Sequence, residues 1–95
     1  MLVREVEIIN RLGLHARPAM LFVETANRFR SRVTVYNSQK KVNGKSIMEM
    51  MLLEAYRGTV LRLEAEGDDA EECLGALVEC VRDKFILEDL PQAKS

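Results

Sequence analysis

The sequence predicts an α+β two-layer sandwich, in which a four-stranded, mostly antiparallel sheet is covered by helices on one face and meets solvent on the other. Its 95 residues suffice for one domain with one hydrophobic core. Segments that alternate like strands and segments with helical period follow one another in the order β-α-β-β-α-β-α. The predicted segments are residues 2–9, 16–29, 32–37, 40–42, 47–56, 59–65 and 70–84.

The first strand and the first helix place a histidine between them. Residues 2–9 alternate between apolar and charged side chains, and the Asn- and Gly-containing residues 10–15 predict a loop. Pro18 fits the first turn of the helix over 16–29, because its missing N–H needs no partner there. His15 therefore stands at the N-terminus of this helix. The side chains expected in the core are Val6, Ile8, Ala19, Phe22, Val23, Ala26 and Phe29.

The other three strands form a hairpin and a separate fourth strand. Residues 32–37 and 40–42 are separated by a turn, and residues 59–65 alternate again. The long connections on either side of the hairpin contain the helices, which favours helices gathered on one face of the sheet. The side chains expected to face the core are Val33, Val35, Leu61, Leu63 and Ala65.

Two further helices follow. Ser46 and Glu49 form the S-x-x-E pattern of a capping box, which marks a helix start. Residues 70–84 give the longest helical pattern, and we place the domain at residues 1–85 with a fraying tail at 86–95. Three apolar residues of the tail could instead dock on a surface that the sequence does not identify: Ile86, Leu87 and Leu90. The core stripe of the last helix is expected to be Ala70, Cys73, Leu74, Leu77, Cys80 and Val81.

The composition excludes several classes of function. The chain has 14 basic and 15 acidic residues, for a net charge of -1, and it lacks the basic excess that supports nucleic-acid binding. Only 5% of its residues are aromatic and none is Trp, so a base-stacking surface is not expected. The N-terminal residues are charged, and no apolar run approaches the roughly 20 residues of a membrane span. We therefore expect neither a signal peptide nor membrane insertion.

The two cysteines indicate a reducing compartment. Cys73 and Cys80 are seven residues apart in a predicted helix, which separates them by about 10 Å. A disulfide needs Cα atoms closer than about 7 Å, so we expect free, buried thiols and a cytoplasmic protein. Two cysteines and one histidine do not make a structural zinc site without carboxylates, and we expect no metal and no cofactor.

His15 and its neighbours favour phosphoryl chemistry. The helix behind His15 presents unpaired N–H groups and the positive end of its dipole. That field disfavours an imidazolium, and a neutral ring has a free lone pair that can act as a nucleophile. The N–H groups offer an anion site, and Arg17 can bring a guanidinium to the same point. The alternative reading is a surface or capping histidine without catalytic function.

Two motifs then resemble one known family. Residues 13–19 (GLHARPA) resemble the active-site motif of HPr, the histidine-containing phosphocarrier of the bacterial sugar phosphotransferase system. Residues 44–48 (GKSIM) resemble that family's second signature, the regulatory serine. The spacing of the two motifs, Gly58 before the last strand and Gly67 at its end also fit. The resemblance implies the HPr-like open-faced β-sandwich with three helices, βαββαβα.

The resemblance implies a phosphoryl carrier rather than a free-standing enzyme. Proteins of this family accept a phosphoryl group from enzyme I and pass it to the IIA domains of sugar permeases. The implied acceptor is Nδ1 of His15, with the N–H groups of Ala16 and Arg17 and the Arg17 side chain binding the phosphoryl group. We expect a monomer. A regulatory phosphocarrier of the nitrogen-type branch and a binding module without a transport role are the alternatives, and Ser46 and Arg17 respectively argue against them.

Ser46 has a structural and a regulatory interpretation. It is expected to cap a helix, and in many HPr proteins the matching serine is phosphorylated by an ATP-dependent HPr kinase/phosphorylase. Glu49 stands where many relatives have glycine or lysine, and it adds a negative charge close to Ser46. That charge repels a phosphate, so corepressor function is not expected, and Glu49 could tune partner choice instead.

Four apolar side chains near the two motifs are expected to form a docking surface. Met20 lies off the core stripe of the first helix, whereas Met50 is expected in the core with Leu53. Flexible thioethers suit a surface that binds several partners. The expected interface consists of Met20, Ile47, Met48 and Met51, with Glu49 beside them.

Overall fold

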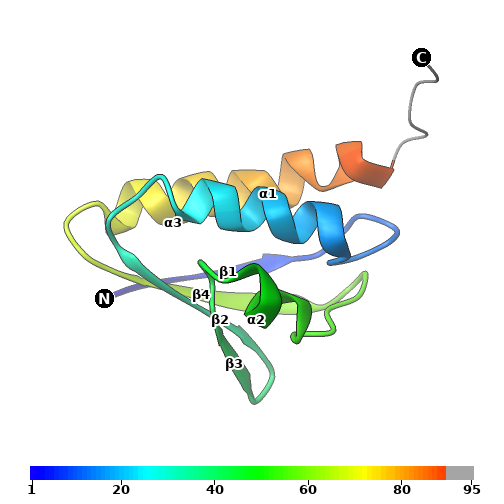
Figure 1. Cartoon of the computed structure of the whole chain (residues 1–95), viewed down its shortest axis with the longest axis horizontal. Helices are drawn as coiled ribbons and strands as arrows, with labels where there is room; N and C mark the ends of the chain where they lie inside the picture. Colours follow the sequence, from blue (N-terminus) through cyan, green and yellow to red (C-terminus); the bar gives the residue numbers. More distant parts are fainter. Residues whose placement is uncertain (90–95) are drawn as a thin grey trace.

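The structure is a computed structural model that describes residues 1–89. One four-stranded sheet carries the helices on one face, and α1 and α3 run side by side across it (Figure 1). The elements are β1 Leu2–Glu7, α1 Ala16–Ala26, β2 Arg32–Asn37, β3 Lys40–Asn43, α2 Ile47–Met51, β4 Val60–Glu66 and α3 Ala70–Glu79. None of the helices within the described residues combines the length and the hydrophobicity that a membrane span requires.

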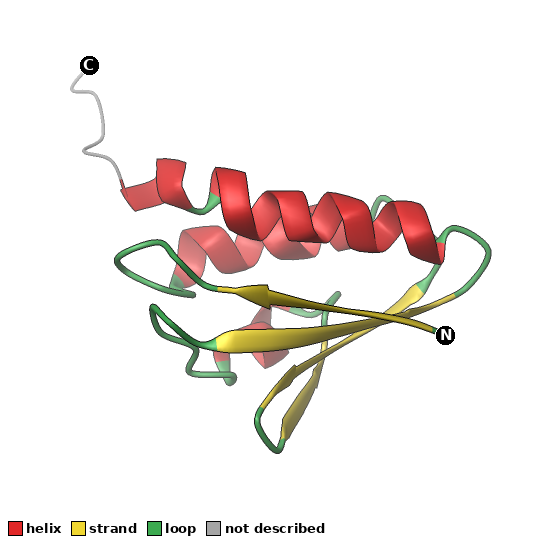
Figure 2. Cartoon of the chain, turned by 180° about the vertical axis from the view of Figure 1, so that it is seen from behind, coloured by secondary structure: helices red, strands yellow, loops and turns green. Residues whose placement is uncertain are grey.

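The sheet has the order β1-β4-β2-β3, and every neighbouring pair is antiparallel. The last strand, β4, lies between the first two: Val6 of β1 pairs with Leu61, and Val33 of β2 pairs with Ala65. The hairpin adds β3 at the edge, with Val42 opposite Val35. The predicted α+β sandwich is therefore confirmed (Figure 2).

The core lies between the sheet and the helices. The alternation predicted for the strands is confirmed in β2 and β4, where alternate side chains are buried, whereas β1 buries only Val6 and β3 only Val42. Glu64 is an exception on the open face: it is 7% exposed and accepts a hydrogen bond from Tyr36. The strand and helix residues predicted for the core are buried, with Phe29 packed partly against them; Cys73 and Cys80 are buried and free, as expected.

Two predicted helices are shorter in the structure. The first ends at Ala26 rather than at residue 29, and Phe29 packs against the core from the following turn. The second ends at Met51 rather than at residue 56, because Glu54 takes a left-handed backbone conformation with φ 52°. That turn buries Leu53 and Ala55, and the Ala55 carbonyl accepts from the Leu14 N–H in the loop before α1.

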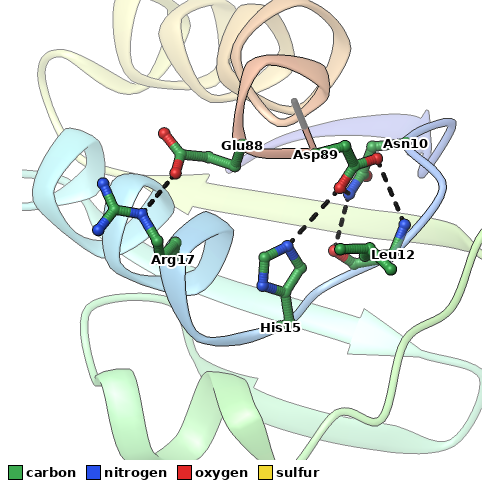
Figure 3. Close-up of polar contacts among 7 residues, drawn as sticks. Asn10, Leu12, His15, Arg17, Glu88 and Asp89 are labelled. Carbon is green, nitrogen blue, oxygen red and sulfur yellow. Dashed lines mark hydrogen bonds and ion pairs between the residues drawn. The ribbon is translucent and has the colours of Figure 1, made fainter. Parts of the chain in front are cut away.

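Residues 80–89 differ most from the prediction. The helical path continues beyond α3 as a π-helical turn over Cys80–Lys84, and Phe85 is fully buried. A 3-10 turn, Ile86–Asp89, follows; we call it the C-terminal turn. The expected fraying is wrong for residues 86–89, because this turn lies against the loop between β1 and α1 (Figure 3). Its contacts are polar and come from Glu88 and Asp89, whereas Ile86 and Leu87 are exposed; Leu90 lies outside the described residues.

Candidate functional site

The loop before α1 is held in place by hydrogen bonds to Ala55 and within the loop itself. The Leu14 N–H donates to the carbonyl of Ala55 at 3.0 Å, and the Asn10 side-chain amide donates to the carbonyl of Gly13 at 2.8 Å. Gly13 has φ +70°, and a Cβ at this position would lie 2.8 Å from the Ala55 carbonyl oxygen. Glycine is therefore required both by the backbone conformation and by the close approach. These contacts fix the backbone of the residues that directly precede His15.

His15 is the N-cap residue of α1, with an extended backbone at φ -91° and ψ -170°. Its carbonyl accepts from the Ala19 N–H at 3.0 Å, but its side chain makes no capping hydrogen bond. The first turn of the helix contains no acidic residue. The N–H groups of Ala16 and Arg17 have no partner within the helix, so they remain available to an anion next to the imidazole.

The two ring nitrogens of His15 have different surroundings. Nε2 is buried, makes no hydrogen bond and lies 3.7 Å from Oδ1 of Asp89. The side chain as a whole is 33% exposed. Nδ1 is on the side of the ring away from Asp89 (Figure 3). A reacting group can therefore approach Nδ1, whereas the C-terminal turn covers Nε2.

Asp89 is bound to the same loop that carries His15. The Leu12 N–H donates to Oδ2 at 3.3 Å and the Asn10 amide donates to Oδ1 at 3.4 Å. Desolvation raises the pKa of the Asp89 carboxyl, but hydrogen bonds from the loop, above all from Leu12, outweigh it and hold the pKa below its usual value. Asp89 is therefore anionic at neutral pH.

Arg17 is paired with the C-terminal turn. Its Nε donates to Oε1 of Glu88 at 2.6 Å, and the hydrogen bond and charge of Glu88 raise the pKa of the guanidinium further. The arginine side chain is 66% exposed, so it can move. The sequence predicts that the Arg17 guanidinium points to the anion site beside His15. In the structure it is paired with the Glu88 carboxylate instead (Figure 3).

The sequence pattern does not single out Glu88 and Asp89, because it places both in a fraying tail and favours docking only for the apolar residues of that tail. An adjacent pair of carboxylates shortly after a long helix was the available signal, since that helix runs back toward the loop of the only histidine.

Ser46 is the N-cap of α2, as predicted. Its Oγ accepts from the Glu49 N–H at 3.2 Å. The reciprocal half of the capping box is absent, because Glu49 Oε1 accepts from the Asn43 N–H at 2.9 Å, while the Ser46 N–H donates to the Asn43 carbonyl. The Glu49 carboxylate thus closes the turn before the helix.

The four residues expected at an interface are all exposed. Met20 lies on α1, and α1 and α2 are in contact. Met50 and Leu53 are fully buried, so the predicted division between core and surface methionines is confirmed. We call the exposed set Met20, Ile47, Met48 and Met51 the apolar patch. Other large apolar side chains that the interface prediction does not name are exposed as well, among them Leu12 and Leu52.

Comparison with known proteins gives a consistent result. Residues 2–83 match the family profile described as "PTS HPr component phosphorylation site". The chain is 47% identical over 85 residues to the phosphocarrier protein HPr of Neisseria meningitidis serogroup A, covering 90% of this chain and 96% of that protein. The crystal structure of HPr-C-His from Thermoanaerobacter tengcongensis gives a TM-score of 0.85 at 52% identity, covering 90% of this chain and 96% of that one. The HPr dimer of the same organism gives 0.71 at 54% identity, covering 84% and 92%.

The fold, the histidine at the start of α1 and these similarities define a phosphocarrier of the phosphotransferase system. The chain belongs to the HPr family. Among residues 1–89, no three His, Cys, Asp or Glu side chains are grouped as metal ligands would be.

Proposed function

We propose that this phosphocarrier accepts the phosphoryl group of enzyme I on Nδ1 of His15 and passes it to IIA domains of sugar permeases. The observation that carries this assignment is the difference between the two ring nitrogens: Nε2 is buried against Asp89, and Nδ1 is not covered by that carboxylate. In the transfer, the Nδ1 lone pair forms the new bond to phosphorus while the bond to the leaving atom of the donor breaks.

The chain stabilises the transferring group with donors that are already in place. The phosphoryl oxygens next to Nδ1 meet the N–H groups of Ala16 and Arg17, and the helix dipole favours their charge. The Arg17 guanidinium completes the site when it leaves Glu88. An exposed arginine suits a carrier, because the phosphoryl group must be released again to the next protein.

The test uses phosphoenolpyruvate and enzyme I as the phosphoryl source. Wild-type protein is expected to take up one acid-labile phosphoryl group per chain, and His15→Ala none. The substitution should leave the fold intact, since His15 makes no side-chain hydrogen bond in the described residues. Equal uptake by His15→Ala would contradict the assignment, because no other histidine exists in the chain.

The apolar patch is the proposed docking surface for both enzyme I and the IIA domains. It lies on α1 and α2, and its members are exposed although they are large and apolar. Clustered exposed apolar groups favour a role in binding. Glu49, at the start of α2, adds a charge that discriminates between partners. The corresponding test replaces Met48, the most exposed member, by Lys and measures transfer as a function of enzyme I concentration.

Phosphorylation of Ser46 by an HPr kinase/phosphorylase is a second proposal, with a structural cost. Ser46 Oγ already caps α2 by accepting a hydrogen bond from the Glu49 N–H. The Glu49 carboxylate lies in the same turn, where it accepts from the Asn43 N–H. A phosphate would therefore meet a like charge. We expect Glu49→Gln to be phosphorylated faster than wild type by such a kinase with ATP; an unchanged rate would show that Glu49 does not oppose it.

The oligomeric state and the compartment are also proposals. We expect a monomer, although one related HPr crystallises as a dimer, and sedimentation of the full chain distinguishes the two. The cytoplasmic location is supported by the two free, buried thiols, for which burial is the main cause of a raised pKa.

A further inference from the structure

We propose that Asp89 is a positioning residue that holds the neutral His15 ring in its Nε2–H tautomer, and so makes Nδ1 the nucleophile. This inference deepens the proposed function and rests on it, because it explains why one nitrogen rather than the other accepts the phosphoryl group. It assigns a role to a carboxylate in the C-terminal turn, beyond the residues 2–83 that match the family profile.

The contact between the two side chains is electrostatic. Nε2 is 3.7 Å from Asp89 Oδ1, which is longer than a hydrogen bond but within ion-pair distance. Nε2 is also buried and has no other partner among the described residues. A lone pair on Nε2 would face the carboxylate oxygen and be repelled, whereas an N–H on Nε2 would be attracted. The neutral ring then keeps its lone pair on Nδ1.

The carboxylate is placed independently of His15. Its side chain is only 11% exposed, and it is held by the Leu12 N–H and the Asn10 amide. Asn10 in turn fixes Gly13, two residues before His15, so one network sets the positions of both partners. The geometry exists before any phosphoryl donor arrives, which is the condition for a positioning role.

The other charges around the ring do not replace Asp89. Arg17 and Glu88 neutralise each other in a direct ion pair, and Asn10 is uncharged. Asp89 is the ion-pair partner of the imidazole within the described part of the chain (Figure 3). The same charge acts after transfer: a ring with phosphorus on Nδ1 and a proton on Nε2 is cationic, and Asp89 stabilises it.

The test is the tautomer of His15 in the unphosphorylated protein. The chain contains one histidine, so a long-range ¹H–¹⁵N spectrum of labelled protein shows one pair of ring nitrogens. At a pH where the ring is neutral, wild type is expected to show a protonated Nε2 and an unprotonated Nδ1. In Asp89→Ala the ratio of the Nε2–H to the Nδ1–H tautomer should fall about three- to tenfold, because an attraction to a buried charged group is lost.

Two matched variants separate this role from a structural one. Asp89→Glu keeps the charge and should restore most of the wild-type ratio. Glu88→Gln removes the adjacent carboxylate, which contacts Arg17 and not His15, and should leave the ratio unchanged. Asp89→Asn keeps the size and can keep the loop contacts, so it shows the effect of charge if Asp89→Ala releases the turn.

The proposal is overturned if both Asp89→Ala and Asp89→Asn keep the wild-type tautomer ratio, or if Glu88→Gln changes it as much as they do. Because this measurement involves no phosphoryl donor, it is independent of the uptake experiment. If enzyme I fails to phosphorylate wild type while the ratio still falls in the Asp89 variants, the proposed function fails and the positioning of His15 by Asp89 stands.

Discussion

The helix starts at His15 and at Ser46 are built in opposite ways. At α1, the N-cap side chain makes no capping bond and the first turn has no acidic residue. At α2, Ser46 Oγ accepts the Glu49 N–H, and the Glu49 carboxylate accepts the Asn43 N–H of the preceding turn. The first start therefore leaves its N–H groups for an external anion, whereas the second satisfies one of its own donors with its N-cap side chain. A phosphoryl group fits the first without loss and must displace contacts at the second.

The largest expected effect is on catalysis at the open helix start. Arg17→Ala should slow phosphoryl transfer from enzyme I about 100-fold, because it removes a charged donor that stabilises the transferring group. The effect is measured as the rate of phosphoryl transfer from enzyme I in a stopped-flow or quenched-flow experiment. Arg28→Ala, an exposed arginine just beyond the other end of α1, should transfer at the wild-type rate, and a wild-type rate for Arg17→Ala would remove Arg17 from the mechanism.

The next effect is on the stability of the loop that precedes His15. Gly13→Ala should destabilise the fold by roughly 2–4 kcal/mol, because it places a Cβ against the Ala55 carbonyl at a positive φ. Urea unfolding measures the change. Gly75→Ala is the control: it lies in α3, its added Cβ meets nothing within 4 Å, and helix propensity predicts a gain of up to about 1 kcal/mol. Equal stabilities of the two variants would show that the loop tolerates a side chain.

The closed helix start should show a smaller effect. Ser46→Ala removes the cap of α2 and should cost about 1 kcal/mol in the free energy of unfolding. Ser46→Asp keeps an acceptor for the Glu49 N–H and should recover part of that loss, less the repulsion from Glu49. If Ser46→Ala were as stable as wild type, the capping contact would contribute nothing and the contrast between the two helix starts would weaken.

The smallest effect concerns the resting state of Arg17. Glu88→Gln weakens an exposed ion pair, which is worth no more than about 1 kcal/mol, so transfer should speed up by about two- to fivefold. The measurement is the transfer rate at low and at high salt, and the gain should shrink at high salt as screening weakens the wild-type pair. A slower Glu88→Gln would mean that Glu88 positions Arg17 for the reaction instead of competing for it.

The fold was predictable because its signals are local and agree with one another. Alternation assigned the core-facing residues of β1, β2 and β4, and Pro18 and Ser46 marked two helix starts close to where they lie. The helix ends were less predictable: Glu54 takes a left-handed conformation that no residue type demands, and it ends α2 early. Tertiary packing, which buries Leu53 and Ala55, decides that turn.

The candidate site was predictable only in part. His15, Arg17 and Ser46 stand in motifs, and their positions at helix starts follow from the chain near them. Glu88 and Asp89 reach the site from more than 70 residues away, through the path of α3 and the π-helical turn that follows it. The periodicity of apolar residues predicts helices and strands, but it does not predict contacts between residues so far apart in the sequence. Glu49 differs from the prediction for a local reason: its carboxylate accepts from the Asn43 N–H, six residues earlier, instead of completing the capping box that its spacing predicted.

The central claim is that Nδ1 of His15 carries the phosphoryl group because Asp89 covers Nε2. The most direct test is a ¹⁵N and ³¹P spectrum of labelled protein phosphorylated with phosphoenolpyruvate and enzyme I, in which the phosphorus couples to one ring nitrogen. The account predicts coupling to Nδ1 and a proton on Nε2. Coupling to Nε2 would contradict it.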